Sequence, residues 1–184
     1  ANTNLENAIL TNAILNCISN SVCSPLDLNN MILKGADLTA ANLDGVDLKD
    51  RDLTGANLTE VDLSGKDLTG TILSGADLTG ANLDGVDLKD RDLTGTILEG
   101  IDLSDKDLTG TILKGADLTD ATLPSISLSE KNFQRTVFDG LDLSGKDLSE
   151  SSLWDASFKN TNLENANLGH ADFRAVDFTK IKNK

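Results

Sequence analysis

"ADLTGANLDGVDLKDRDLTG", residues 76–95, contains four five-residue units with Leu at the centre of each. The spacing continues: every fifth residue from Leu28 to Phe178 is Leu or Phe, which makes 31 consecutive positions, 26 Leu and 5 Phe. Asp or Asn usually stands one residue before, and a small or β-branched residue two before. A period of five matches neither a helix, at about 3.6, nor a strand, at about 2. It predicts a solenoid, in which each unit buries its apolar side chain only against stacked neighbours.

A second, longer period predicts the geometry of the coil. Residues 36–75 and 76–115 are near copies, and residues 116–155 form a more diverged third copy. Forty residues are eight units, or two turns of a four-sided coil, whose adjacent turns pair as short parallel β-bridges about 4.8 Å apart. We therefore expect one elongated domain over residues 1–184, with a narrow core.

The five-residue period is interrupted once, near the start of the chain. Leu15 is the last residue in the first register, and Ile18 resumes the period displaced by three residues. The break, placed at residues 16–27, contains Pro25, which predicts a bulge or short loop. No other insertion interrupts the repeat, although inserted loops are where solenoids often build binding sites.

The chain resembles the pentapeptide repeat family in its A(D/N)LXX units, among them Ala36–Thr39, Ala81–Asp84 and Ala166–Gly169. The resemblance covers most of the chain. It implies an all-β fold, a right-handed quadrilateral parallel β-helix, in which the central Leu or Phe and the residue two before it point inward. Some members of the family protect DNA gyrase or topoisomerase by imitating duplex DNA, and those dimerise through their C-terminal ends. Many others, secreted effectors among them, have no known biochemical activity, so the resemblance implies a fold more than a function.

Charge and composition narrow the function classes. A net charge of −14 argues against direct nucleic-acid binding, which needs basic patches. No stretch approaches about 18 consecutive apolar residues, so no membrane span is expected. No signal-peptide pattern is seen, and the chain is either a mature product or an excised domain. The location is left open: the cytoplasm is favoured over a lumenal, periplasmic or secreted location.

Residue types for catalysis are scarce. His170 is the only histidine, and a His-paired nucleophile is not expected with Cys17 and Cys23 so distant in sequence. No glycine-rich phosphate loop, CxxC pair or metal-ligand spacing is present. We predict no enzyme, no cofactor and no metal site. Two free thiols are favoured over a Cys17–Cys23 disulfide, because the two side chains are expected to face opposite ways.

Basic residues occupy six positions that should point inward: Arg51, Lys66, Arg91, Lys106, Lys131 and Lys146. A buried, unpaired cation is costly, so each must find a partner or bend outward. One interpretation is a staggered salt-bridge ladder with nearby Asp residues, the alkyl stems packing on Leu and the charged groups reaching water. The alternative is a charge pattern matched to a partner, or a cation site on the acidic surface.

Aromatic residues gather in the last third of the chain. Phe138, Phe158 and Phe178 are 20 residues apart and should stack in successive turns, with Phe173 on an adjacent face. They predict either a tighter core or an interface. Trp154 follows a central Leu at an outward position, which makes it a candidate contact residue or a side chain packed on Phe158 or another long neighbour. Trp154, Phe173 and Phe178 are the candidate interface residues.

Three functions follow from these observations. The first is a non-catalytic, rod-shaped scaffold or protein-interaction module that binds an unidentified protein and pairs with a second copy through its C-terminal end. The second is a DNA-mimicking inhibitor or protector of DNA gyrase or topoisomerase. The third is a β-helical domain of a secreted bacterial effector.

Overall fold

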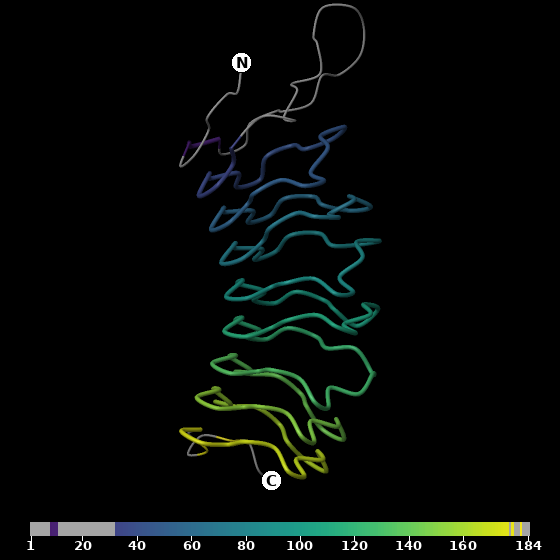
Figure 1. The fold of residues 1–184 in the computed structure, drawn as a ribbon, viewed down its shortest axis with the longest axis vertical. Coiled ribbons are helices and arrows are strands. Elements are labelled where there is room, and N and C mark those ends of the chain that lie inside the picture. The colour runs from purple at the N-terminus through teal and green to yellow at the C-terminus, as the bar shows by residue number, and fades with distance from the viewer. Residues whose placement is uncertain (1–7, 11–31, 177, 179–180, 182–184) are drawn as a thin grey trace, which may run out of the picture. The chain divides into compact units, whose positions relative to one another are not determined.

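The computed structural model describes residues 8–10, 32–176, 178 and 181. It divides into two compact units, Ala1–Asp87 and Leu88–Lys184, which are built by the same rules. Within each unit, successive turns of the backbone lie stacked on one another (Figure 1). The described residues contain no helix and no strand longer than one bridged residue, and their β-pairing consists of isolated parallel bridges. The predicted register break at residues 16–27 lies outside the described residues.

The bridges join residues that are 20 positions apart. Asp37 pairs with Asn57 in the first unit and Asp117 with Val137 in the second. Since 20 residues are four of the five-residue units, each turn of the coil has four sides, as the sequence predicts. One bridge departs from this spacing: Ile9 pairs with Asp37, 28 positions further on, which is three more than a multiple of five.

Most described corners of the coil are four-residue turns that begin at the central Leu or Phe. At the first of the repeated "ANLDGV" segments, Val46 N donates to Leu43 O at 2.9 Å. Gly45 takes a φ of 68°, the left-handed conformation that type II turns require at this position. Asn42 Oδ1 accepts Asp44 N at 2.8 Å and holds the entry to the turn. The Asn–Leu–Asp–Gly sequence therefore specifies the corner directly.

The central residues fill the core. All of them from Leu33 to Phe158 are buried, and so are most of the small residues two positions before them, such as Ala36 and Ala116. This confirms the predicted inward pair. Burial of the repeated Leu side chains stabilises each coil by roughly 1.5–3 kcal/mol per side chain.

The predicted phenylalanine stack is present in the second unit. The rings of Phe138 and Phe158 lie 5.0 Å apart with 11° between their planes, and those of Phe158 and Phe178 lie 6.4 Å apart at 10°. Phe133 meets Phe138 edge-on at 5.1 Å. Aromatic pairs at such separations add about 0.5–1.5 kcal/mol each beyond the area they bury.

Candidate functional site

The outward surface is acidic, and the turns hold its carboxylates. Asp67 Oδ1 accepts Thr69 N at 2.8 Å, and Asp107 Oδ1 accepts Thr109 N at 2.8 Å. Hydrogen bonds to an ionised carboxylate favour its charged form, so the Thr109 hydroxyl and then its backbone N–H lower the pKa of Asp107. Hydrogen bonds from the Ser or Thr two residues on lower the pKa of further carboxyls in the same way: Asp52, Asp62, Asp102, Asp142 and Asp147. These groups are ionised at neutral pH.

The inward cations use two kinds of partner. Lys106 is 5% exposed and forms the carboxylate pair that the salt-bridge interpretation predicts, with Nζ 2.9 Å from Asp105 Oδ1. The other three lysines donate to main-chain carbonyls instead. Lys66 Nζ lies 2.7 Å from Leu43 O, Lys131 Nζ 2.8 Å from Leu108 O and Lys146 Nζ 2.5 Å from Pro124 O.

The predicted salt-bridge ladder is therefore wrong for Lys66, Lys131 and Lys146. Each ammonium group instead reaches a main-chain carbonyl about one turn back. The environment of Lys131 shows the effect of this position: burial lowers its pKa, and the charge of Asp107 opposes that shift in part. Arg51 and Arg91 are half-buried.

Trp154 and Arg135 form an outward pair in the second unit. The Arg135 guanidinium carbon lies 5.1 Å from the centre of the Trp154 ring, within the range of a cation–π contact. Arg135 Nε also lies 3.6 Å from Asp155 Oδ2. Trp154 is half-buried, and it packs on this long side chain, which is one of the alternatives that the sequence leaves open. Arg135 was not predicted, although its position 19 residues before Trp154 places it almost one turn back.

Phe173 and Phe178 lie at the last described turn of the second unit. Their ring centres are 5.4 Å apart with the planes tilted by 58°. Phe173 is half-buried, whereas Phe178 is 43% exposed, in contrast to the fully buried Phe138 and Phe158. The three candidate interface residues thus separate into an outward corner, at Trp154, and an aromatic edge, at Phe173 and Phe178.

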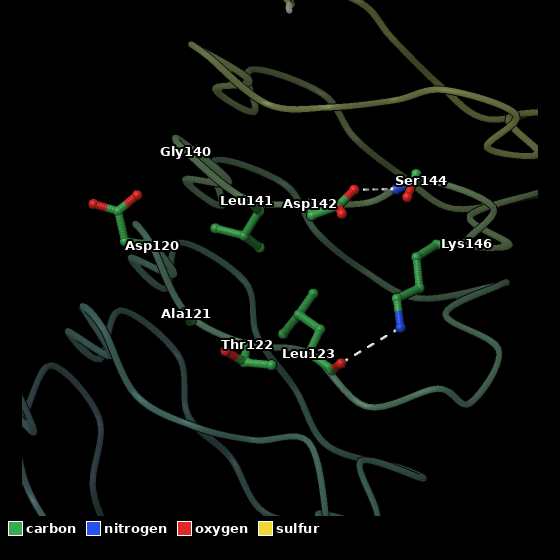
Figure 2. A pocket seen from close by; sticks show the side chains of 9 residues that line it. All are labelled: Asp120, Ala121, Thr122, Leu123, Gly140, Leu141, Asp142, Ser144 and Lys146. Atoms are coloured by element: carbon green, nitrogen blue, oxygen red, sulfur yellow. Dashed lines mark hydrogen bonds between the residues drawn. The ribbon is translucent and has the colours of Figure 1, made fainter.

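A pocket of about 480 Å³ opens between two turns of the second unit (Figure 2). Asp120, Ala121, Thr122 and Leu123 line one side, and the other side comes from residues 140–146. Figure 2 shows Lys146 reaching across it to Leu123 O, 3.4 Å from Nζ.

The pocket lies beside a described corner that departs from the repeat. Pro124 has no N–H to donate to residue 122, and Ser125 does not take the left-handed φ of the regular turn. Ile126, at a nominally inward position, is consequently 38% exposed. The sequence did not predict this, because Leu123 and Leu128 keep the five-residue period.

Of the residues considered for catalysis, only His170 belongs to the part of the chain that the structure describes. His170 lies exposed at a turn with a φ of 59°, and Cys17 and Cys23 lie outside the described residues. Within the described ranges, no group of three or more His, Cys, Asp or Glu side chains is arranged to hold a metal ion.

The chain belongs to the pentapeptide repeat family. The family model, described as pentapeptide repeats, matches eight copies over residues 24–50, 52–90, 92–123 and 142–180. The fold is accordingly the right-handed quadrilateral β-helix of that family, in agreement with the four-sided turns and parallel bridges of both units.

Solved structures of pentapeptide repeat proteins are similar to the chain. HetL, which is involved in heterocyst differentiation regulation in the cyanobacterium Nostoc, is 29% identical over 94% of this chain and 73% of its own, with a TM-score of 0.41. A protein of the Arabidopsis thaliana thylakoid lumen is 26% identical over 53% and 68%, with a TM-score of 0.35. QnrB1, a plasmid-mediated fluoroquinolone resistance protein, is 18% identical over 99% and 81%, with a TM-score of 0.32.

No curated protein matches the chain. No helix long and apolar enough to span a membrane occurs in the part of the chain that the structure describes.

Proposed function

We propose that the chain is a non-catalytic scaffold that binds a protein partner through outward side chains of its second unit. The observation that carries this proposal is the Trp154–Arg135 pair, half-buried Trp against a largely exposed guanidinium at 5.1 Å. Trp and Arg are the residue types most enriched among the strongest contributors to protein interfaces. The remaining outward positions around this corner are mostly short polar side chains, which suit the rim of such a contact.

The experiment is a quantitative pull-down from the native host with Trp154→Ala and Arg135→Ala chains. Lys159→Ala is the matched control, since Lys159 is also outward and also pairs with an Asp, at 3.7 Å from Asp139. We expect one partner to be lost with both corner variants and kept with the control. An identical set of bound proteins for all four chains would contradict the proposal.

We further propose that the aromatic edge at Phe173 and Phe178 pairs with a second copy of the chain. The support is the 43% exposure of Phe178 at the edge of an otherwise buried ring stack. Phe178→Asp places a charge on that edge and should convert a dimer into a monomer in light scattering. Ile112→Asp, on a side of the same unit, is the control for a general effect of adding charge. An unchanged mass for Phe178→Asp would rule out this contact.

A second candidate function, the DNA-mimicking inhibitor or protector of DNA gyrase or topoisomerase, is favoured by the ionised carboxylates of the turns. Asp62, Asp102, Asp142 and their counterparts are held by the turns as ionised carboxylates, and the net charge of the chain is −14. A gyrase supercoiling assay tests this function. If micromolar protein causes no inhibition of gyrase and no protection from quinolones, this function is eliminated.

A further inference from the structure

One of the four sides of the coil differs from the others in charge. In the second unit it consists of the five-residue segments 91–95, 111–115, 131–135, 151–155 and 171–175, and we call it the basic side. Its basic residues outnumber its acidic ones by five to three. The five are Arg91, Lys114, Lys131, Arg135 and Arg174, and the three are Asp92, Asp155 and Asp172. On each of the other three sides acidic residues are in excess, as expected for a chain of net charge −14.

The opposite side of the same unit is purely acidic. Its segments, 101–105, 121–125, 141–145 and 161–165, carry four acidic residues and no basic one: Asp102, Asp105, Asp142 and Glu164. The first unit has the same pattern. Its basic side, at residues 32–35, 51–55 and 71–75, has Lys34 and Arg51 against Asp52 alone, whereas the opposite side has only acidic residues among its charges. The separation of charge between opposite sides is therefore a property of both units.

The basic side also carries exposed apolar side chains. Ile32 and Ile72 lie on it in the first unit and are 41% and 50% exposed, and Ile112 lies on it in the second unit and is 44% exposed. Trp154 belongs to the same side and is half-buried against the Arg135 guanidinium. The opposite side of the second unit has no outward Ile, Leu, Phe or Trp. Positive charge and apolar contact area thus occur together on one side.

Some of the basic groups on this side are available to a partner. Lys114 is exposed and makes no ion pair with any residue that the structure describes. Arg135 has Asp155 at 3.6 Å, but both side chains are largely exposed, and such a pair is weak in water. Arg174 is held more closely, with Nη2 2.7 Å from Asp172 Oδ2. Lys114 and Arg135 are accordingly the groups that carboxylates of a partner can reach at least cost.

The dimensions of this surface suit an extended polypeptide segment. Adjacent turns of a parallel coil are about 4.8 Å apart, so segments 111–115 and 151–155, two turns apart, are separated by about 10 Å. The whole basic side of the second unit, from 91–95 to 171–175, extends over about 19 Å, which about six extended residues would cover.

We propose that the partner bound at the Trp154 corner is an acidic polypeptide with apolar side chains, and that it lies along the basic side of the second unit. The inference rests on the proposed function and adds the chemistry of the partner. Carboxylates of the partner pair with Lys114 and Arg135, and its apolar side chains contact Ile112 and Trp154. A second copy of the chain fits less well, because the side that matches in charge has no apolar side chains to offer.

Fluorescence of Trp154 tests the inference, because Trp154 is the only tryptophan of the chain. The probe is a synthetic peptide of Glu with Leu at every third position, about ten residues long so that it covers the side. A matched peptide has Gln in place of Glu. In about 0.1 M salt, charges more than about 10 Å apart are largely screened, so the acidic residues of the opposite side repel the probe little.

We expect the Glu peptide to change the Trp154 emission to a saturating value, with an affinity at least about tenfold higher than that of the Gln peptide. Equal affinities of the two peptides, or no change with either, would overturn the inference.

Lys114→Glu tests whether the site extends two turns beyond the corner. It replaces an attraction by a repulsion and should weaken binding of the Glu peptide at least about fivefold. Lys159→Glu is the matched control, since Lys159 is an exposed lysine of the same unit on another side. It should change the affinity less than about twofold. Equal effects of the two substitutions would also overturn the inference.

Other occupants of the basic side give different results. Vesicles of phosphatidylserine and phosphatidylcholine present an anionic surface without a polypeptide, and an emission change with these vesicles but not with the Glu peptide would overturn the inference. A mass in light scattering that rises with protein concentration, and that Lys114→Glu lowers, would assign this side to a second copy instead.

The proposed function and this inference fail separately. If Trp154→Ala loses its partner in the pull-down but the Glu peptide does not bind, the proposed function stands and the acidic partner is excluded. If the Glu peptide binds as expected but the pull-down is unchanged by Trp154→Ala, the basic side recognises acidic polypeptides and the proposed function is contradicted.

Discussion

The Asp50 carboxylate lies directly over Gly70, one turn further along the first unit, so that a Cβ on Gly70 would overlap Asp50 Oδ1. Both residues take the left-handed conformation, with φ of 57° and 71°. The second unit repeats the arrangement at Asp90 and Gly110. Glycine is required at residue 70 for two reasons, the positive φ and the carboxylate above it.

Gly70→Ala should therefore destabilise the chain more than Gly45→Ala. Both substitutions put a Cβ on a left-handed residue, at about 1–2 kcal/mol, but nothing lies within 4 Å of a Cβ on Gly45. The overlap with Asp50 should add about 1 kcal/mol or more. Denaturant unfolding of the two variants measures the difference.

Asp50→Gly in the Gly70→Ala background is the control for the overlap. Glycine suits the left-handed φ at residue 50 and removes the carboxylate, so Gly70→Ala should cost about as much in the Asp50→Gly background as Gly45→Ala costs in wild type. If Gly70→Ala and Gly45→Ala unfold at the same denaturant concentration, the side chain of Asp50 moves aside freely and the argument fails.

The phenylalanine stack predicts a gradient of stability effects. Phe158 is fully buried between Phe138 and Phe178, so Phe158→Ala should cost about 3–5 kcal/mol. Phe178→Ala removes a ring that is 43% exposed and stacked on one side by Phe158, and it should cost clearly less. Equal losses in thermal or denaturant unfolding would show that Phe178 is covered in solution.

The sequence was sufficient to predict the coil, because the Leu or Phe at every fifth position fixes the register, and the register determines which side chains point inward. Leu43, Gly45 and Asn42 each have one role in the corner, and the role follows from residue type alone. The two periods of five and 20 then place residues in columns. The phenylalanine stack followed from that placement without further information.

The partners of the inward lysines could not be predicted in the same way. Lys131 has a carboxylate nearby, at Asp107, and a carbonyl, at Leu108, and both accept hydrogen bonds. Which of the two accepts depends on their distances from the Lys131 ammonium group, and the sequence does not contain these distances. The exposed Ile126 was missed for another reason: the period continues through Leu123 and Leu128, and only the missing N–H of Pro124 signals the irregular corner.

Replacing residues 122–126 with the sequence of residues 82–86 should regularise that corner. "TLPSI" would become "NLDGV", through Thr122→Asn, Pro124→Asp, Ser125→Gly and Ile126→Val. The new Gly supplies the left-handed φ, and the new Asn supplies the acceptor for the turn. We expect higher stability in denaturant and slower proteolysis at this corner. Lower stability would mean that the irregular corner is a requirement of the fold rather than a departure from it.

The lowered pKa of Asp107 predicts that the stability of the fold falls at acid pH. The Thr109 hydroxyl and backbone N–H, and then the charges of Lys89 and Lys131, lower the folded pKa of Asp107 below the ordinary 3.8. A carboxyl whose folded pKa is below its unfolded pKa contributes stability above the unfolded value and loses it as the pH falls through the folded value. Asp107→Asn keeps an Oδ1 acceptor for the turn but cannot ionise. The stability difference between wild type and this variant should therefore shrink as the pH falls from about 5 to about 2.

Thr109→Val separates the hydrogen bond from the general charge of the surface. Without the Thr109 hydroxyl, the folded pKa of Asp107 moves back toward its ordinary value, so less stability depends on its ionisation. In the Thr109→Val background, Asp107→Asn should change the dependence of stability on pH between about 5 and about 2 less than it does in wild type. An equal change in both backgrounds would assign the effect to the groups that both backgrounds share, the backbone N–H of residue 109 and the charges of Lys89 and Lys131. The comparison thus decides whether the Thr109 hydroxyl lowers the pKa of this carboxyl.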